Sequence, residues 1–255
     1  MTALVPSRAQ TEKLAHLAAK AQAGQWSVAD DIDWRRAPHL PLWMSRDQAR
    51  AMISQLYHGE IATSRLCQDL LRDVAPGPAR RCLAYQIADE RRHAEAFRRY
   101  LEPLGGVAPV DPDLAWALDA AGRGSAGTLG AMVAFHVVVE GEVLRVQGSL
   151  ARLLPCPLLN DINRRVARDE ARHVAFGRIV LGEAVAALSA ETRTQLYDWI
   201  FELWQRTAAR SLDGRAGNSM AQHLLRGWLA GGWHHHAAAL AQVGLVPTAE
   251  RERAA

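Results

Sequence analysis

Lysine is almost absent from this chain, and no long apolar run occurs. Of the 30 basic residues only Lys13 and Lys20 are lysine, so arginine carries nearly all the positive charge, and the net charge is +3. Because this charge is small, it gives no reason to expect a nucleic-acid partner. No stretch of about 18 or more uncharged apolar residues occurs, so we expect neither a membrane span nor a membrane partner.

Cysteine is scarce as well. The three residues Cys67, Cys82 and Cys156 lie far apart, are odd in number and form no Cys-x-x-Cys pattern. Such spacing argues against a disulfide framework or a zinc knuckle, and for free thiols in a reducing compartment. The N-terminus shows no basic region followed by an apolar run, so no signal peptide is expected. We therefore expect a cytoplasmic location.

Strand patterns are missing, since no run alternates apolar and polar residues with a period of two. The composition is 49% hydrophobic and rich in Ala, Leu and Arg, which favours helices. A chain of 255 residues can bury a sizeable core. We expect one all-α domain spanning residues 1–255, with a short helix in residues 1–25, a four-helix core at about 45–188 and further helices at about 190–243.

One phrase occurs twice, as Asp89-Glu90-Arg91-Arg92-His93 and as Asp169-Glu170-Ala171-Arg172-His173. In each, the Glu and the His three positions later share a helix face. One further Glu precedes each phrase at the same offset of thirty residues. Two Glu-x-x-His pairs plus a Glu from each of two other helices form the ligand set of a dimetal site in a four-helix bundle. The predicted metal ligands and catalytic residues are Glu60, Glu90, His93, Glu140, Glu170 and His173.

The four acids fall near the midpoints of helices expected at about 45–74, 79–101, 126–154 and 157–188. Midpoint acids on four antiparallel helices lie at one level of a bundle. Glu142 competes with Glu140 because it also lies in an apolar run, but the repeated offset favours Glu140. The simpler alternative is a set of surface helices with ion pairs, which explains one copy of the phrase better than two.

The residue types indicate the chemistry. Carboxylate with imidazole suits iron or manganese, whereas thiolate would suit zinc or iron–sulfur clusters. A metal-bound His normally donates its other N–H to a carboxylate. We therefore expect Asp89 and Asp169 to accept from the two His ligands, with Arg92 and Arg172 paired to these Asp residues.

The ligand pattern resembles the ferritin-like diiron carboxylate oxygenases over about residues 45–188. The resemblance implies a ferritin-like four-helix bundle with additional N- and C-terminal helices, two Fe ions with Fe/Mn as an alternative, and O2 as co-substrate. It is specific for the metal site but not for the substrate. Hydroxylation, N-oxygenation, desaturation and C–C cleavage all stay open.

Several positions depart from particular branches of that superfamily. Phe97 stands where the radical-generating subunit of ribonucleotide reductase has Tyr, which argues against a tyrosyl radical there. Val166 stands where arylamine N-oxygenases have a third His; His136, one turn before the third Glu, can substitute for it beside the ligands or be an ordinary core residue. Leu144 replaces the Thr of the multicomponent hydroxylases.

These features favour an O2-dependent diiron oxygenase acting on a small or medium organic substrate in an apolar pocket. No flavin, nicotinamide or iron–sulfur motif is visible, so a ferredoxin or flavoprotein reductase must supply electrons. A homodimer is compatible with the sequence. The alternatives are a ferroxidase or iron-handling ferritin-like protein, and a scaffold whose metal serves stability alone.

Two other features stand outside this pattern. Trp26, Trp34 and Trp43 lie in an irregular stretch and are expected to pack it across the bundle, or else to line a substrate entrance. His234, His235 and His236 are consecutive and cannot share a helix face, so a dedicated metal site there is not expected.

Overall fold

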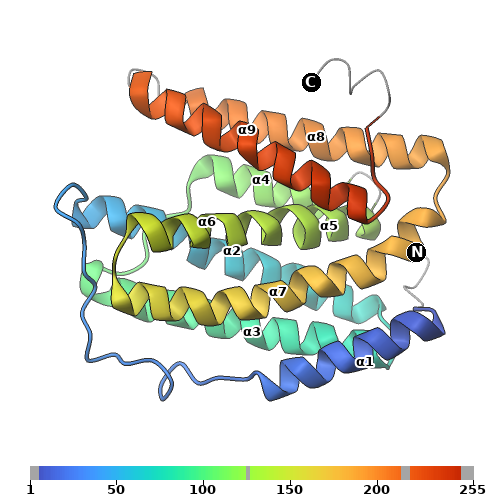
Figure 1. Ribbon diagram of the computed structural model, residues 1–255, viewed down its shortest axis with the longest axis horizontal. Helices are drawn as coiled ribbons and strands as arrows, with labels where there is room; N and C mark the ends of the chain where they lie inside the picture. Colours follow the sequence, from blue (N-terminus) through green and yellow to red (C-terminus); the bar gives the residue numbers. More distant parts are fainter. Residues whose placement is uncertain (1–5, 125–126, 214–218, 248–255) are drawn as a thin grey trace. The chain divides into compact units, whose positions relative to one another are not determined.

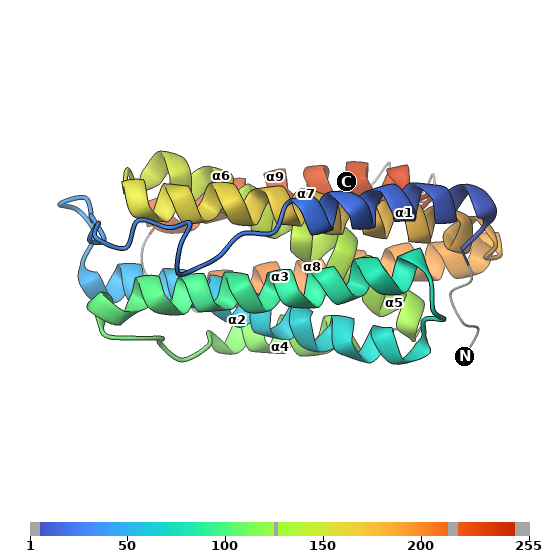
Figure 2. The same cartoon turned by 90° about the horizontal axis from the view of Figure 1, so that it is seen from below.

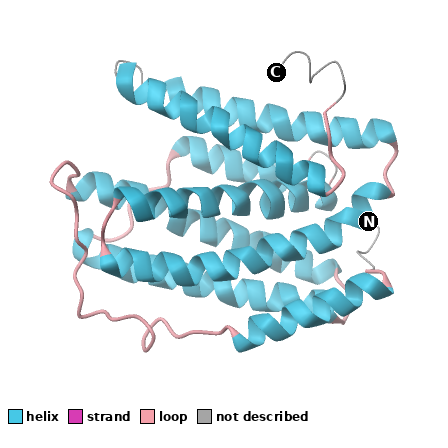
Figure 3. Cartoon of the chain, viewed as in Figure 1, coloured by secondary structure: helices cyan, strands magenta, loops and turns pink. Residues whose placement is uncertain are grey.

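The computed structural model describes residues 6–124, 127–213 and 219–247, and every regular element in those ranges is helical (Figures 1 and 3). This confirms the all-α prediction. The elements in chain order are α1 (Arg8–Ala23), α2 (Arg46–Asp73), α3 (Pro78–Leu101), the short 3-10 helix η1 (Glu102–Leu104), α4 (Pro112–Arg123), α5 (Thr128–Val133), the π-helical turn η2 (Ala134–Val139), α6 (Glu140–Leu153), α7 (Pro157–Ala186), α8 (Ala190–Asp213) and α9 (Ser219–Gln242).

The described residues fall into two compact units that alternate along the chain. Unit 1 holds those within Met1–Asp111 and Glu142–Phe176, and unit 2 those within Pro112–Gly141 and Gly177–Ala255. The boundaries cut through α6 and α7, so neither unit is a continuous stretch of sequence. A single domain over residues 1–255 stays a prediction. None of the helices in the described ranges has both the length and the apolar character needed to cross a membrane.

Unit 1 is built on the pair α2 and α3, which lie side by side, with α1 against α3 (Figure 2). The predicted capping box starts α2: Ser45 Oγ accepts from the backbone N–H of Gln48 at 3.1 Å, and Gln48 Oε1 accepts from that of Ser45 at 2.9 Å. Pro78 occupies the first turn of α3, where its missing N–H costs nothing. These local signals place the midpoints of α2 and α3 opposite each other.

One end of unit 1 is filled by an apolar core drawn from α2, α3, α6 and α7. Phe97, Leu159 and Ile162 are fully buried there. Burying each such side chain contributes about 1.5–3 kcal/mol. Because Phe97 lies one turn after His93 on α3, this core extends to the level of the acidic residues and fixes the rotation of α3.

The helix expected at about 126–154 is interrupted. Its first expected residue lies outside the described residues, and the run from Thr128 to Leu153 contains the π-helical turn η2 directly before Glu140. A π turn accommodates one extra residue per turn, so residues on either side of it no longer follow one 3.6-residue face. The inward face predicted from Met132 to Leu144 as one continuous stripe is therefore wrong.

Unit 2 contains α4, α8 and α9, with α8 in contact with both of the others. Arg210 on α8 bonds Asp113 on α4 at 2.9 Å. Trp233 on α9 packs against Phe201, with ring centroids 4.7 Å apart. Of the three consecutive His residues, His236 is buried against Trp204, while His234 and His235 are exposed.

Candidate metal centre

Five of the six predicted ligands belong to unit 1 and come from three helices. Glu60 lies near the middle of α2, Glu90 and His93 lie on α3, and Glu170 and His173 lie on α7. All five side chains are buried, with exposed fractions of 3% or less. The spacing of three residues places each Glu on the same face as its His, so both pairs point into the interior.

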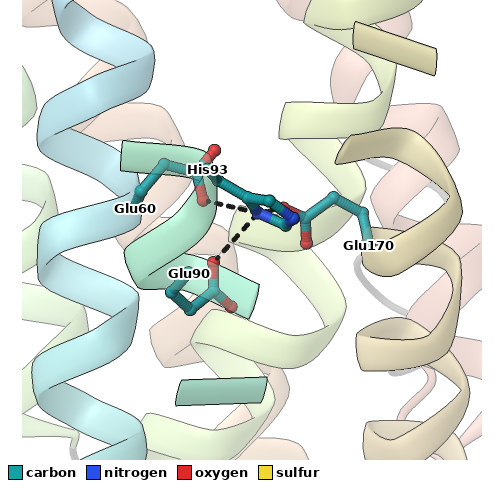
Figure 4. Close-up of side chains that lie close together, drawn as sticks. All are labelled: Glu60, Glu90, His93 and Glu170. Carbon is teal, nitrogen blue, oxygen red and sulfur yellow. Dashed lines mark hydrogen bonds and ion pairs between the residues drawn. The ribbon is translucent and has the colours of Figure 1, made fainter. Parts of the chain in front are cut away.

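Four of these residues converge on one point (Figure 4). Glu60, Glu90, His93 and Glu170 each offer a ligand atom, and the four atoms lie within 4.8 Å of one another. His93 Nδ1 lies 3.3 Å from Glu60 Oε2, 3.6 Å from Glu90 Oε2 and 3.2 Å from Glu170 Oε1. One imidazole nitrogen and three carboxylates therefore surround a single position.

The second histidine faces two of the same carboxylates. His173 Nδ1 lies 3.2 Å from Glu90 Oε1 and 2.9 Å from Glu170 Oε2. Glu90 and Glu170 are thus common to both imidazoles, whereas Glu60 contacts His93. This arrangement offers two adjacent metal positions joined by two shared carboxylates.

The sixth predicted ligand lies in unit 2. Glu140 is buried and is the first residue of α6, and its meeting with the other five stays a prediction. Its competitor Glu142 belongs to unit 1, is partly exposed and pairs with Arg145 at 2.8 Å. An acid already neutralised by a neighbouring Arg is a weaker candidate ligand, which is consistent with the preference for Glu140.

Burial and close packing shift the pKa values of this cluster. Burial raises the pKa of Glu60 well above its ordinary value, and the Glu170 carboxylate adds to the rise. Burial opposes the charged forms of His93 and His173, but the surrounding carboxylates outweigh it and raise both pKa values. For Glu90, contact with His173 overcomes the effect of burial and lowers the pKa. Protons and metal ions therefore compete for the same donors.

The donor set fits a pair of iron or manganese ions. Carboxylates and imidazoles are the ligands these metals prefer. Glu60 Oε1 is buried and has no hydrogen-bond donor in the described residues, as expected of a metal-facing oxygen. The free thiols of Cys67, Cys82 and Cys156 are not among the clustered donors found in the described chain, so a thiolate-bound metal is not indicated.

A ring of four charged side chains lies behind the two imidazoles. His93 Nε2 lies 3.1 Å from Asp169 Oδ2, and His173 Nε2 lies 3.2 Å from Asp89 Oδ2. Arg92 bonds Asp89 and, at 3.0 Å, Asp169; Arg172 bonds Asp169 at 2.5 Å and Asp89 at 3.1 Å. Each Asp thus receives one His and both Arg residues, on the pattern expected from the repeated phrase.

This ring is neutral and almost closed to water. Both Asp residues are 1% exposed, and their two charges are balanced by those of Arg92 and Arg172. Burial opposes the charge of Asp169, but its bond with His93 and the Arg172 guanidinium lower its pKa below the ordinary value. Asp169 therefore remains an ionised acceptor for the N–H of His93, which leaves Nδ1 free to bind a metal.

Sequence reasoning missed two residues at this ring, Gln25 and Trp26. Trp26 Nε1 donates to Asp169 Oδ2 at 2.9 Å, and Gln25 Nε2 donates to Asp89 Oδ1 at 3.2 Å. Neither residue belongs to a motif or a helical face. The packing expected of the neighbouring tryptophans is mixed: Trp34 packs against the unit 1 core, whereas Trp43 is 64% exposed and its predicted packing is wrong.

His136 lies in η2 of unit 2 and is fully buried. A Cβ placed on Gly177 would lie 2.5 Å from its Cβ, so the His136 backbone packs directly onto α7 within that unit. Its predicted place beside the ligands stays untested. In unit 1, a small cavity of about 10 Å³ lies between α1, α3 and α7, beside Asp89 and His173. It has room for about one water molecule and is too small for an organic substrate.

Comparison with known proteins gives matches in structure alone. No family model matches the chain, and neither does any curated protein. R2-like ligand-binding oxidase with an aerobically reconstituted Mn/Fe cofactor matches with a TM-score of 0.63 and 17% identity, covering 91% of this chain and 93% of that one. Two variants of it with anaerobically reconstituted Mn/Fe match with TM-scores of 0.60 and 0.59 at 19% and 20% identity, covering 89% and 91% of this chain and 92% and 94% of theirs. The chain therefore has the ferritin-like helical fold of these R2-like oxidases.

Proposed function

We propose that this protein is an O2-dependent non-haem dimetal oxygenase that oxidises a small or medium organic substrate. The observation that carries the proposal is the sharing of Glu90 and Glu170 between His93 and His173 in a buried site. Two shared carboxylates hold two metal ions close enough to act as one redox unit. The structural neighbours are named oxidases with an Mn/Fe cofactor, so both Fe/Fe and Mn/Fe are candidates.

The protein groups have separate roles in this proposal. Glu60, Glu90, His93, Glu170 and His173 hold the metal pair, with Glu140 as the sixth ligand. The pair supplies the exchange of electrons with O2 when it is bound. Asp169 and Asp89 keep the N–H of each imidazole on Nε2, so that Nδ1 faces inward. Burial of the cluster excludes water, which protects reactive species from side reactions.

Electrons and substrate come from outside this site. No redox cofactor motif is visible in the sequence, so the proposal includes an external donor such as a ferredoxin or a flavoprotein reductase. The substrate is an organic small molecule, and hydroxylation, N-oxygenation, desaturation and C–C cleavage are its possible fates. A cytoplasmic location and a homodimer belong to the same proposal.

The experiment is anaerobic loading with Fe(II), alone and together with Mn(II), followed by metal analysis and exposure to O2. Two metals per chain and rapid O2-dependent absorbance changes are expected. A panel of fatty aldehydes, acyl carriers and amines is then screened for product. If O2 consumption is unaffected by every organic compound and iron is turned over instead, the protein is a ferroxidase. If the loaded protein does not react with O2, the metal serves stability alone.

A further inference from the structure

Two adjacent residues connect the N-terminal helix to both halves of the charged ring. Gln25 and Trp26 follow α1, whose C-cap is Gly24. The Gln25 amide donates to Asp89 Oδ1 at 3.2 Å, and the Trp26 indole donates to Asp169 Oδ2 at 2.9 Å. Neighbouring residues thus bond two different Asp residues, one from each copy of the repeated phrase.

Each of those Asp residues holds a different imidazole. Asp169 accepts from His93 Nε2 at 3.1 Å, and Asp89 accepts from His173 Nε2 at 3.2 Å. Two parallel relays result: Trp26 to Asp169 to His93, and Gln25 to Asp89 to His173. Since a buried carboxylate with a missing donor is costly, each Asp depends on its outer partner to keep its orientation.

The segment is also held against the two arginines of the ring. Arg92 Nη1 donates to Gln25 Oε1 at 2.7 Å, and its guanidinium lies 4.9 Å from the centroid of the Trp26 ring. A Cβ placed on Gly24 would lie 3.4 Å from Arg172 Nη1. Glycine at this position therefore lets the chain run close over Arg172 and bring the two following side chains to the Asp residues.

We propose that Gln25 and Trp26 are positioning residues, each of which fixes one histidine of the proposed metal pair through one Asp. The inference rests on the proposed function for the role of the histidines, but the hydrogen-bond relays are present in the protein itself. Trp26 acts on the position beside His93, and Gln25 on the position beside His173. Because the two residues are adjacent, movement of this one segment alters both positions.

The two relays are not equivalent. Trp26 has a single N–H donor, and its ring lies nearly parallel to that of His93, with centroids 6.3 Å apart and an angle of 16°. Gln25 is an exposed residue that shares its amide between Asp89 and Arg92. The relay to His93 is therefore more rigid, and the two metal positions should differ in affinity.

The test compares Trp26→Phe and Gln25→Met with the control Trp34→Phe. Trp34 lies in the same N-terminal segment, but its indole donates to the backbone carbonyl of Val28. Co(II) serves as the probe, and its visible absorption is titrated anaerobically. To separate the positions, each variant is also made in a His173→Ala background, which leaves the His93 position, and in a His93→Ala background, which leaves the other.

The expected result is selective loss. Trp26→Phe should weaken Co(II) binding about tenfold in the His173→Ala background and leave the His93→Ala background unchanged, since outer partners of metal ligands affect affinity on this scale. Gln25→Met should show the reverse. The absorption spectrum at saturation should shift for the same variants. Equal affinity in all proteins, or the same loss with Trp34→Phe, overturns the inference.

A second measurement keeps the inference separate from the proposed function. If the wild type binds no metal, the proposed function fails, and the relays are judged in the metal-free protein by NMR of ¹⁵N-labelled histidine. Trp26→Phe should speed solvent exchange of the His93 Nε2 proton, with His58, which lies 2.8 Å from the Ala108 carbonyl, as the internal reference. Unchanged exchange at His93 overturns the inference whatever the metal content.

Discussion

His93 Nδ1 lies 3.2 Å from Glu170 Oε1, although the two residues belong to different helices and different copies of the repeated phrase. The same distance separates His173 Nδ1 from Glu90 Oε1. Each histidine therefore meets the glutamate of the opposite copy as well as its own. This exchange makes the site a joint product of α3 and α7, so that neither Glu-x-x-His pair forms a complete site alone.

Removal of a shared carboxylate should affect both metal positions, whereas removal of Glu60 should affect one. Glu170→Ala is expected to lose both metal ions, because its oxygens face His93 and His173. Glu60→Ala is expected to lose the ion beside His93 and keep the other. Metal analysis after Fe(II) loading measures both. Glu95→Ala is the control, since Glu95 is an exposed partner of Arg98 on α3; equal metal loss in Glu60→Ala and Glu170→Ala would contradict the sharing.

The ligand on α6 can be identified by a matched pair of variants. Glu140→Ala is expected to lose a metal ion and the reaction with O2, because the repeat offset assigns it the role that Glu60 has in the first half. Glu142→Ala is expected to keep both, because its carboxylate pairs with Arg145. Retention of two metals by Glu140→Ala but not by Glu142→Ala would reverse the assignment.

Local patterns explain why much of this site could be predicted from sequence. Helix periodicity and the Glu-x-x-His spacing act over one or two turns, so they placed Glu90 with His93 and Glu170 with His173 on single faces. The capping box at Ser45 likewise located the start of α2. The repeated offset then suggested which further acids stand at the same level.

Contacts without a spacing rule could not be predicted. Trp26 meets Asp169 across more than half the chain, and no local pattern links them. The π turn before Glu140 adds a residue to one turn without any proline or glycine inside it to mark the change. Trp43 shows the opposite error, since an aromatic residue in an irregular segment was assumed to pack and is instead exposed.

The stability of the metal-free protein should fall as the pH rises above about 6.5. Carboxylates around His93 and His173 raise their pKa values well above the ordinary 6.5, so the folded protein binds protons that the unfolded chain releases. That contribution is complete below 6.5 and is lost as the pH rises through the raised values; Glu60, also raised, acts in the same direction. Urea unfolding at several pH values measures it.

Metal should reverse this trend. Binding requires neutral imidazoles and ionised carboxylates, so affinity increases as protons leave. The rise in Tm on adding Mn(II) is therefore expected to grow between about pH 6 and 8. A metal-free protein that becomes more stable over this range, or a Tm rise that shrinks, would contradict the assigned directions of the pKa shifts.

Close contact of α7 with the π turn gives a prediction within unit 2. Gly177→Ala places a Cβ 2.5 Å from the Cβ of His136, a distance that real structures avoid, so η2 or α7 must shift. Such overpacking is expected to cost about 1–3 kcal/mol of unfolding free energy. Gly182→Ala is the control on the same helix, because nothing lies within 4 Å of its added Cβ. That variant should gain up to about 1 kcal/mol from helix propensity. Urea denaturation separates the two, and equal stability of both variants would mean that α7 does not press on His136 in solution.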